Sequence, residues 1–138
     1  MINIIPKKLG RSGWSNSNYL PKEVLEKIYG QEAKQYFNSN YQTPFIFSEF
    51  KSFDLIELDQ LLQTVGWGRR PLRRVRRALD NSLIKVGLWK HDSKFPRLIG
   101  FARCTGDGVI DATIWDVAIH PVYQGLGFGK QLMLYVMN

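Results

Sequence analysis

A short run of glycines near the C-terminal end of the chain has the residue types and spacing of an anion-binding loop. The segment Gln124–Lys130 reads Gln-Gly-Leu-Gly-Phe-Gly-Lys, with glycines at alternate positions. Glycine adopts positive φ angles easily, so this segment can turn successive backbone N–H groups toward one point. A helix that follows adds its unpaired first-turn N–H groups and the positive end of its dipole. The pattern therefore predicts a site for phosphate or diphosphate.

Two other phosphate-binding loops do not match this segment. A Walker A loop requires Ser or Thr directly after its lysine, whereas Gln131 follows Lys130. A dinucleotide-binding loop has a different glycine spacing and opens a β-α-β unit, whereas this segment follows an antiparallel hairpin. The alternative without function is a glycine turn between a strand and a helix, for which one glycine is sufficient. Three glycines and a lysine favour the phosphate site.

The elements that position the loop follow from hydrophobic patterns. Asp54 is placed to cap a helix that ends at Gly66, with Glu57 three residues after the cap as in a capping box. Gly106-Asp107-Gly108 is typical of a tight hairpin turn. We expect an α/β (α+β) fold with a mixed, mostly antiparallel central sheet flanked by helices. The expected strands are 45–50, 83–90, 97–105 and 109–119, and further helices begin at Pro71 and Phe128.

The two ends of the chain differ from the part between them. Residues 1–43 are rich in Asn, Ser, Lys, Gln and Tyr, and only Pro21–Tyr29 has a helical pattern. We expect this region to be a loosely packed N-terminal arm, and residues 44–138 to form the domain. The last helix shows no closing signal before Asn138. The pattern therefore predicts a domain that is incomplete at its C-terminus.

The strand, proline turn and glycine loop together resemble a known family. Ile119–Lys130 reads Ile-His-Pro-Val-Tyr-Gln-Gly-Leu-Gly-Phe-Gly-Lys, which is similar to the Gcn5-related N-acetyltransferase (GNAT) superfamily, whose shared loop is Gln/Arg-x-x-Gly-x-Gly/Ala. Thr105–Gly108 and Ala112–Val117 resemble its plastid and cyanobacterial branch. That branch includes plastid-genome-encoded acetyltransferases and chloroplast enzymes that act on protein lysines or on arylalkylamines such as serotonin. The resemblance covers residues 44–138.

The resemblance implies an enzyme that transfers acetyl from acetyl-CoA to a primary amine, which is a protein lysine, an arylalkylamine or a polyamine. It implies a plastid (chloroplast) or cyanobacterial cytoplasmic location. Backbone groups of Val117, Ala118 and Ile119 would pair with the pantetheine arm. The residues implied to hold the pyrophosphate are Gln124, Gly125, Leu126, Gly127, Phe128, Gly129 and Lys130.

Asp116 is the candidate catalytic residue, because it lies in the strand that leads into the loop. A carboxylate there could take the proton from an ammonium substrate, directly or through water. Asp111 lies five residues earlier, so the two are expected on opposite faces of the sheet. The alternative for each is a strand-end carboxylate satisfied by hydrogen bonds. His120 is expected to have a structural place, and Cys104 to be a small core residue.

Composition limits the remaining function classes. Cys104 is the single cysteine, so no intrachain disulfide forms and a reducing compartment is expected. His91, His120 and Cys104 lack paired ligand spacing, so no metal site is expected. No run reaches the roughly 18 apolar residues of a membrane span, and the N-terminus lacks the pattern of a secretory signal.

Six arginines between Arg69 and Arg77 carry most of the net charge of +7. They are either a solvated helix face, an electrostatic guide for the anionic cofactor or an acidic substrate, or a nucleic-acid contact. The run lacks interleaved aromatic residues, so the sequence does not favour nucleic acid. Two alternatives to the enzyme stay open: a CoA-binding regulatory protein without turnover, and a basic nucleic-acid-binding module that uses Arg69–Arg77. A homodimer also stays open.

Overall fold

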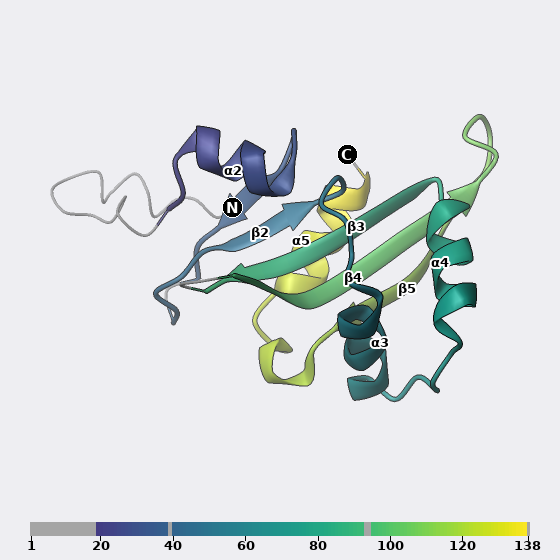
Figure 1. Cartoon of the computed structure of the whole chain (residues 1–138). Helices are drawn as coiled ribbons and strands as arrows, with labels where there is room; N and C mark the ends of the chain where they lie inside the picture. The colour runs from purple at the N-terminus through teal and green to yellow at the C-terminus, as the bar shows by residue number, and fades with distance from the viewer. Residues whose placement is uncertain (1–18, 39, 93–94, 138) are drawn as a thin grey trace, which may run out of the picture.

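An antiparallel sheet forms the centre of the computed structural model, which describes residues 19–38, 40–92 and 95–137 (Figure 1). The five described strands lie side by side in sequence order: β1 (Lys34–Tyr36), β2 (Phe45–Ser48), β3 (Ile84–His91), β4 (Pro96–Gly106) and β5 (Ala112–Ile119). The described helices are α2 (Lys22–Tyr29), α3 (Leu55–Thr64), α4 (Leu72–Asp80), the short 3-10 helix η2 (Pro121–Tyr123) and α5 (Phe128–Met137). The expected fold class, an antiparallel sheet flanked by helices, is confirmed.

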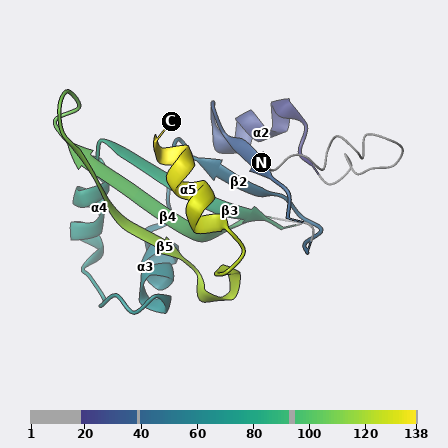
Figure 2. The same cartoon turned by 180° about the vertical axis from the view of Figure 1, so that it is seen from behind.

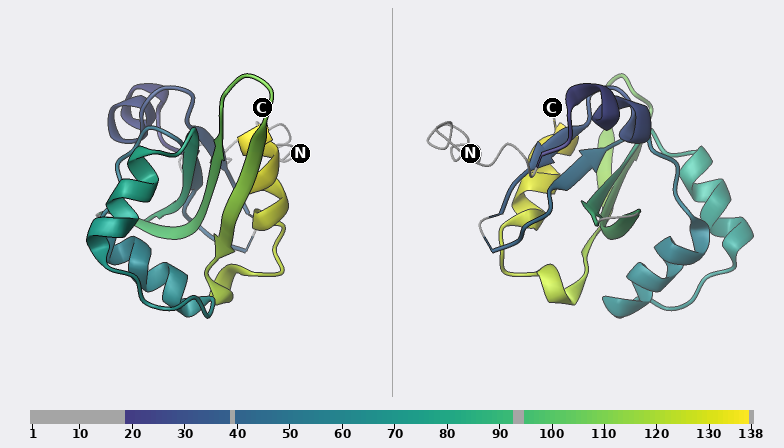
Figure 3. Two further views of the ribbon diagram at one scale, coloured as in Figure 1. Left: turned by 90° about the vertical axis from the view of Figure 1, so that its right-hand side faces the viewer. Right: turned by 60° about the vertical axis from the view of Figure 1, so that its left-hand side comes forward.

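Two hydrophobic cores lie on opposite faces of this sheet. Helices α2, α3 and α4 pack on one face, where Trp89 and Phe101 are among the buried residues. Helix α5 packs on the other face through Phe128, Leu132 and Val136. Figures 1 and 2 show the two faces, and the left view of Figure 3 shows the sheet between the helix layers. The helix that follows the glycine loop is therefore fixed to the sheet along its length.

The start of α3 is fixed by two carboxylates with different partners. Asp54 Oδ1 accepts hydrogen bonds from the amides of Ile56 and Glu57 at 2.9 and 3.3 Å, which confirms the predicted cap. Glu57 does not reach back to the cap as a capping box would. Its Oε2 accepts a hydrogen bond from the Leu98 amide at 2.8 Å and so ties α3 to β4. The helix ends before Gly66, whose φ is 91°.

Residues 19–38 and 40–43 contain a helix, α2, and a strand, β1, instead of the loose arm expected from their composition. β1 pairs with β2 and extends the sheet by one strand. Leu25 and Tyr29 of α2 are buried in the core that α3 and α4 share. The polar composition did not indicate this packing. A few apolar residues at helical spacing are enough to anchor one short helix. The expectation for residues 1–18 and 39 lies outside the described residues.

The hairpin between β4 and β5 is longer than the tight turn that was predicted. Asp107 Oδ1 accepts hydrogen bonds from the amides of Val109, Ile110 and Asp111 at 2.8, 2.9 and 3.1 Å. These bonds fold residues 107–111 into a loop, so β5 begins at Ala112 instead of Val109. Asp111 therefore lies in the loop, and the prediction that it faces away from Asp116 across the sheet does not apply.

The buried Tyr29 and the half-buried His91 form a hydrogen-bonded pair at the end of the sheet opposite the β4–β5 hairpin. The Tyr29 hydroxyl lies 2.7 Å from His91 Nδ1. Burial lowers the pKa of His91 from its ordinary value of 6.5, against the opposing effect of Asp92 and with the help of Lys51. Burial also raises the pKa of Tyr29. The folded state therefore favours a neutral imidazole whose Nδ1 accepts a hydrogen bond from the Tyr29 hydroxyl.

The sign of this effect gives a testable prediction. Because the pKa of His91 is lowered in the folded state, the unfolded chain binds the proton more tightly. The stabilisation is present above the ordinary pKa of about 6.5 and is lost as the pH falls through the folded pKa. We expect the melting temperature of the wild type to fall more steeply between about pH 7 and 5 than that of His91→Asn. Equal slopes for the two proteins would contradict this.

Candidate functional site

The glycine segment forms an open loop between η2 and α5. Gly125 and Gly127 have φ angles of 81° and 90°, in the region that favours glycine. A β-carbon added at either position meets no heavy atom within 4 Å. The requirement for glycine is therefore conformational, and the space beside this backbone is not filled by side chains. Both facts agree with a loop that faces a ligand.

Gly129 has a different backbone conformation from Gly125 and Gly127. It is the second residue of α5, and its backbone is helical. A β-carbon there would lie 3.9 Å from Ile119 Cγ1, which is an ordinary van der Waals contact. Two glycines shape the loop, and Gly129 adds a first-turn amide of the helix.

The backbone amides of residues 125–130 are free to bind an anion. In the described part of the chain none of these six amides donates a hydrogen bond, and the next amide, that of Gln131, donates to the carbonyl of Gly127 at 3.1 Å. The positive end of the α5 dipole lies at the same place. The exposed Lys130 side chain makes no ion pair with a described residue. This combination of unpaired amides, dipole and lysine is suited to a diphosphate.

Three other side chains of the segment face the protein and hold the loop in shape. Gln124 Nε2 donates a hydrogen bond to the carbonyl of Ile119 at 2.9 Å. Phe128 is 1% exposed, and its ring centroid lies 4.5 Å from that of Phe45. Leu126 packs against the same core. Of the residues expected to hold the pyrophosphate, Phe128 and Leu126 can offer only backbone groups to a ligand, whereas the exposed Gln124 keeps part of its side-chain amide free.

The strand before the loop has an open edge. β5 is the last strand of the described sheet, so its outer side has no strand partner there. Ala118 and Ile119 are buried on opposite faces of the sheet, whereas Val117 is 38% exposed. An extended amide-containing ligand could add to this edge as a further strand would. The carbonyl of Ile119 is already bonded by Gln124, so its amide is the more available group.

Asp116 lies at a β-bulge and is held by an arginine from the neighbouring strand. Phe101 pairs with Ala118 and Arg103 pairs with Trp115, so β5 has one extra residue between these pairs. Asp116 has a φ of 56°, which is uncommon for a residue other than glycine. Its Oδ2 accepts a hydrogen bond from Arg103 Nε at 2.6 Å. Because of the bulge, the Asp116 side chain departs from the regular alternation along β5 and points toward Arg103.

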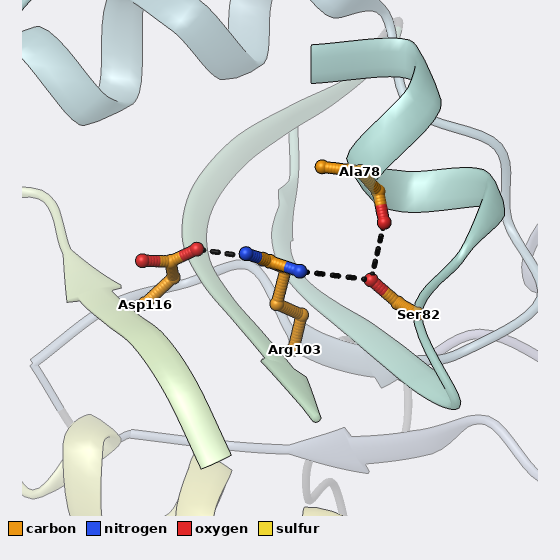
Figure 4. Close-up of polar contacts among 4 residues, drawn as sticks. All are labelled: Ala78, Ser82, Arg103 and Asp116. Carbon is orange, nitrogen blue, oxygen red and sulfur yellow. Dashed lines mark hydrogen bonds and ion pairs between the residues drawn. The ribbon is translucent and has the colours of Figure 1, made fainter. Parts of the chain in front are cut away.

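A chain of hydrogen bonds connects Asp116 to α4. Arg103 Nη1 donates to Ser82 Oγ at 3.3 Å, and Ser82 Oγ donates to the carbonyl of Ala78 at 2.7 Å. Figure 4 shows these contacts, with the second oxygen of Asp116 pointing away from Arg103. One oxygen of the carboxylate, Oδ2, is therefore satisfied within the protein, as the structural alternative for this residue requires, while no described residue forms a hydrogen bond with Oδ1.

Comparison with known proteins gives the family. Residues 52–138 match the acetyltransferase (GNAT) family. The chain belongs to this family. It is 63% identical over 132 residues to the ycf52-like N-acetyltransferase of Prochlorococcus marinus, a match that covers 96% of this chain and 73% of the relative. The GNAT structure of a protein from Xanthomonas campestris is 32% identical with a TM-score of 0.55, covering 67% of this chain and 64% of that one.

Two plant GNAT relatives carry different acceptors in their names. A histone acetyltransferase of Glycine max is 45% identical over 95 residues, which cover 64% of this chain and 41% of that protein. A chloroplastic serotonin N-acetyltransferase of Oryza sativa is 41% identical over 83 residues, which cover 58% of this chain and 40% of that protein. The chain thus spans less than half the length of either plant protein. Membership of the GNAT family therefore does not by itself define the acceptor.

A groove of about 390 Å³ lies beside Asp116 in this GNAT chain, between the α3–α4 layer and the sheet. Its floor is apolar, and arginines of the α3–α4 connection and of α4 line it. Neither this groove nor the role of Arg103 was predicted from the sequence. Two features of the sequence could have indicated them. Phe101 and Arg103 are two residues apart in one strand and so share a face, and α4 contains leucines as well as arginines. The groove residues are Leu58, Leu62, Arg69, Arg70, Pro71, Arg74, Val75, Ala78, Leu79, Phe101, Arg103 and Asp116.

His120 and Cys104 have local structural contacts. His120 Nδ1 accepts a hydrogen bond from the Val122 amide at 3.1 Å and so caps η2. Cys104 is buried, with 4% of its surface exposed. Among the described residues, no three His, Cys, Asp or Glu side chains are grouped so as to hold a metal ion. None of the described helices has the length and apolar character to cross a membrane.

Proposed function

We propose that this chain carries the acetyl-CoA site of an N-acetyltransferase that acts on primary amines. The observation that carries the proposal is the run of free amides at residues 125–130, directly after an open strand edge and at the start of α5. The diphosphate of acetyl-CoA matches the amides, and its pantetheine amides match the edge of β5. The open space beside Gly125 and Gly127 accepts such a group without rearrangement.

In this mechanism acetyl-CoA supplies an activated acetyl group as a thioester, and the protein supplies position and polarity. The β5 edge at Val117–Ile119 aligns the pantetheine arm, and the loop fixes the phosphates. The bulge at Asp116 takes one backbone N–H out of the strand ladder, where it can donate to the carbonyl oxygen as negative charge develops. The amine attacks the thioester carbon, and the CoA thiolate leaves. Holding both reactants in place supplies much of the rate gain.

Asp116 is the proposed proton acceptor for the attacking ammonium group. Its Oδ1 is not used by Arg103, and the residue lines the groove where an amine would approach. We expect Asp116→Asn to lower kcat/KM by about 10²–10⁴-fold. The amide keeps an oxygen for Arg103, so stabilisation by acetyl-CoA should be unchanged. Turnover within threefold of the wild type would assign Asp116 to structure alone.

The proposed function is tested by release of free CoA thiol from acetyl-CoA with a panel of lysine peptides, arylalkylamines and polyamines. We expect acetyl-CoA to raise the melting temperature and at least one amine class to give thiol release. Stabilisation without turnover against the whole panel would leave a CoA-binding protein. No stabilisation at millimolar acetyl-CoA would reject the cofactor assignment. The names and sources of its relatives support a plastid or a cyanobacterial cytoplasm as the place of action.

A further inference from the structure

The groove beside Asp116 has more positive than negative charge. Four guanidinium groups and one carboxylate line it. Two of the four have acidic partners: Arg103 is bonded to Asp116 at 2.6 Å, and Arg69 Nε lies 3.8 Å from Asp59 Oδ2. Asp59 is buried, whereas the Arg69 side chain is 81% exposed. The internal charges of the groove are therefore balanced at these two positions.

Arg70 and Arg74 lack such partners. Within the described residues, neither has a carboxylate oxygen within 4.0 Å. The Arg70 guanidinium lies over the ring of Trp67, 5.6 Å from its centroid, which orients it while leaving its N–H groups for another partner. Both side chains are exposed where they line the groove. They form a basic rim that the protein itself does not neutralise.

Helix stability does not account for this rim. The rim arginines lie just before and within the first turn of α4, which contains no acidic residue. Positive side chains at a helix N-terminus oppose the helix dipole and lower the stability of the helix. An anionic partner reverses this penalty. The position of the charges, and not only their number, therefore favours a negatively charged ligand.

The floor of the groove is apolar, whereas its sides carry charged groups. Leu58, Leu62 and Phe101 lie at its floor and are almost fully buried. Asp116 offers its Oδ1 at the sheet side. An aliphatic stem with a terminal ammonium group matches this floor and this carboxylate. The negative groups would then remain outside, at Arg70 and Arg74.

We propose that the acceptor is a lysine side chain in an acidic peptide segment, with its stem in the groove, its ammonium at Asp116 and its flanking carboxylates at Arg70 and Arg74. This deepens the proposed acetyl transfer and rests on it. A phosphate backbone would meet the rim equally well but has nothing to place beside Asp116. An arylalkylamine would fill the floor but leave the rim unpaired.

Three peptides test the proposal. They share one central lysine and differ only in their flanking residues, which are all Glu, all Gln or all Arg. Binding is measured by fluorescence anisotropy with CoA present at low ionic strength, where surface charges are least screened. We expect the Glu peptide to bind about tenfold more tightly than the Gln peptide and the Arg peptide to bind most weakly. Thiol release with acetyl-CoA should follow the same order.

A pair of double variants tests whether the preference for the Glu peptide depends on the two rim arginines or on the total positive charge near α4. Arg70→Gln/Arg74→Gln should reduce the preference for the Glu peptide to within about twofold. Arg73→Gln/Arg77→Gln removes the same charge from α4 residues that do not line the groove, and should keep the preference. Equal binding of the three peptides, or equal loss in the two double variants, would overturn the proposal. So would stronger binding of a single-stranded RNA that both double variants weaken alike.

Failure of the peptide proposal alone can be distinguished from failure of the transferase proposal. If acetyl-CoA stabilises the chain and another amine class is acetylated while the Glu peptide is not preferred, the peptide proposal is wrong and the transferase proposal stands. If acetyl-CoA neither stabilises the chain nor supports turnover with any amine, the transferase proposal is wrong, and the peptide proposal that rests on it is wrong as well.

Discussion

Replacing Gly127 by aspartate is expected to abolish the thermal stabilisation that acetyl-CoA gives to the wild-type chain. Gly127 has a φ of 90°, so an L-residue there strains the loop by about 1–2 kcal/mol. The new carboxylate would also lie among the amides that bind the diphosphate. A ligand at 100 times its Kd stabilises a protein by about 2.7 kcal/mol, so the lost shift is measurable. The measurement is the melting temperature as a function of acetyl-CoA concentration.

Gly66→Asp is the matched control for this variant. Gly66 has a φ of 91°, and a β-carbon there meets no heavy atom within 4 Å, as at Gly127. It lies in the connection between α3 and α4 instead of the loop before α5. The two variants thus share the backbone strain and the change in charge. We expect Gly66→Asp to lower the melting temperature without ligand but to keep the acetyl-CoA shift. An acetyl-CoA shift that survives in Gly127→Asp would contradict the position of the cofactor.

Replacing Phe128 by alanine is expected to destabilise the fold by about 3–5 kcal/mol. The side chain is 1% exposed, and its ring contacts those of Phe45, Tyr36 and Tyr123 at centroid distances of 4.5, 5.4 and 6.5 Å. Its removal leaves a cavity under the first turn of α5. Urea unfolding measures the change in the free energy of unfolding.

Phe95→Ala provides the comparison for Phe128, because Phe95 is 63% exposed. We expect this substitution to change the free energy of unfolding by no more than about 0.5 kcal/mol. Phe128→Leu, which keeps most of the apolar volume, should fall between the two. A loss below about 1 kcal/mol for Phe128→Ala would show that the loop and α5 are not held to the sheet in this way.

The local signals of the sequence were sufficient for the centre of the fold and for the loop. Apolar runs at strand and helix spacing predicted β2, β3, β4, α3, α4 and α5, and the structure has all of them. The glycines of Gln124–Lys130 predicted a turn into a helix with free amides. Such features depend on residues close together in the chain, so a single sequence contains them.

Contacts between distant parts of the chain were not predictable in the same way. The bulge at Asp116 depends on how β5 pairs with β4, and the partner Arg103 lies thirteen residues away in sequence. The groove forms only when α3 and α4 pack on the sheet. The positions of α2 and β1 likewise depend on contacts with other elements, such as that between Tyr29 and His91. In each case the residue types were visible, but the partner was set by tertiary packing.

Titration of the ¹⁵N-labelled 16.0 kDa chain with acetyl-CoA, followed by ¹H–¹⁵N NMR, tests the central claim most directly. We expect the backbone amides of Gly125–Lys130 to show the largest chemical-shift changes and to become protected from hydrogen exchange, with smaller changes along Val117–Ile119. The opposite result is that acetyl-CoA leaves these loop amides unchanged while amides elsewhere in the chain respond. That result would show that the free amides before α5 are not where the diphosphate binds.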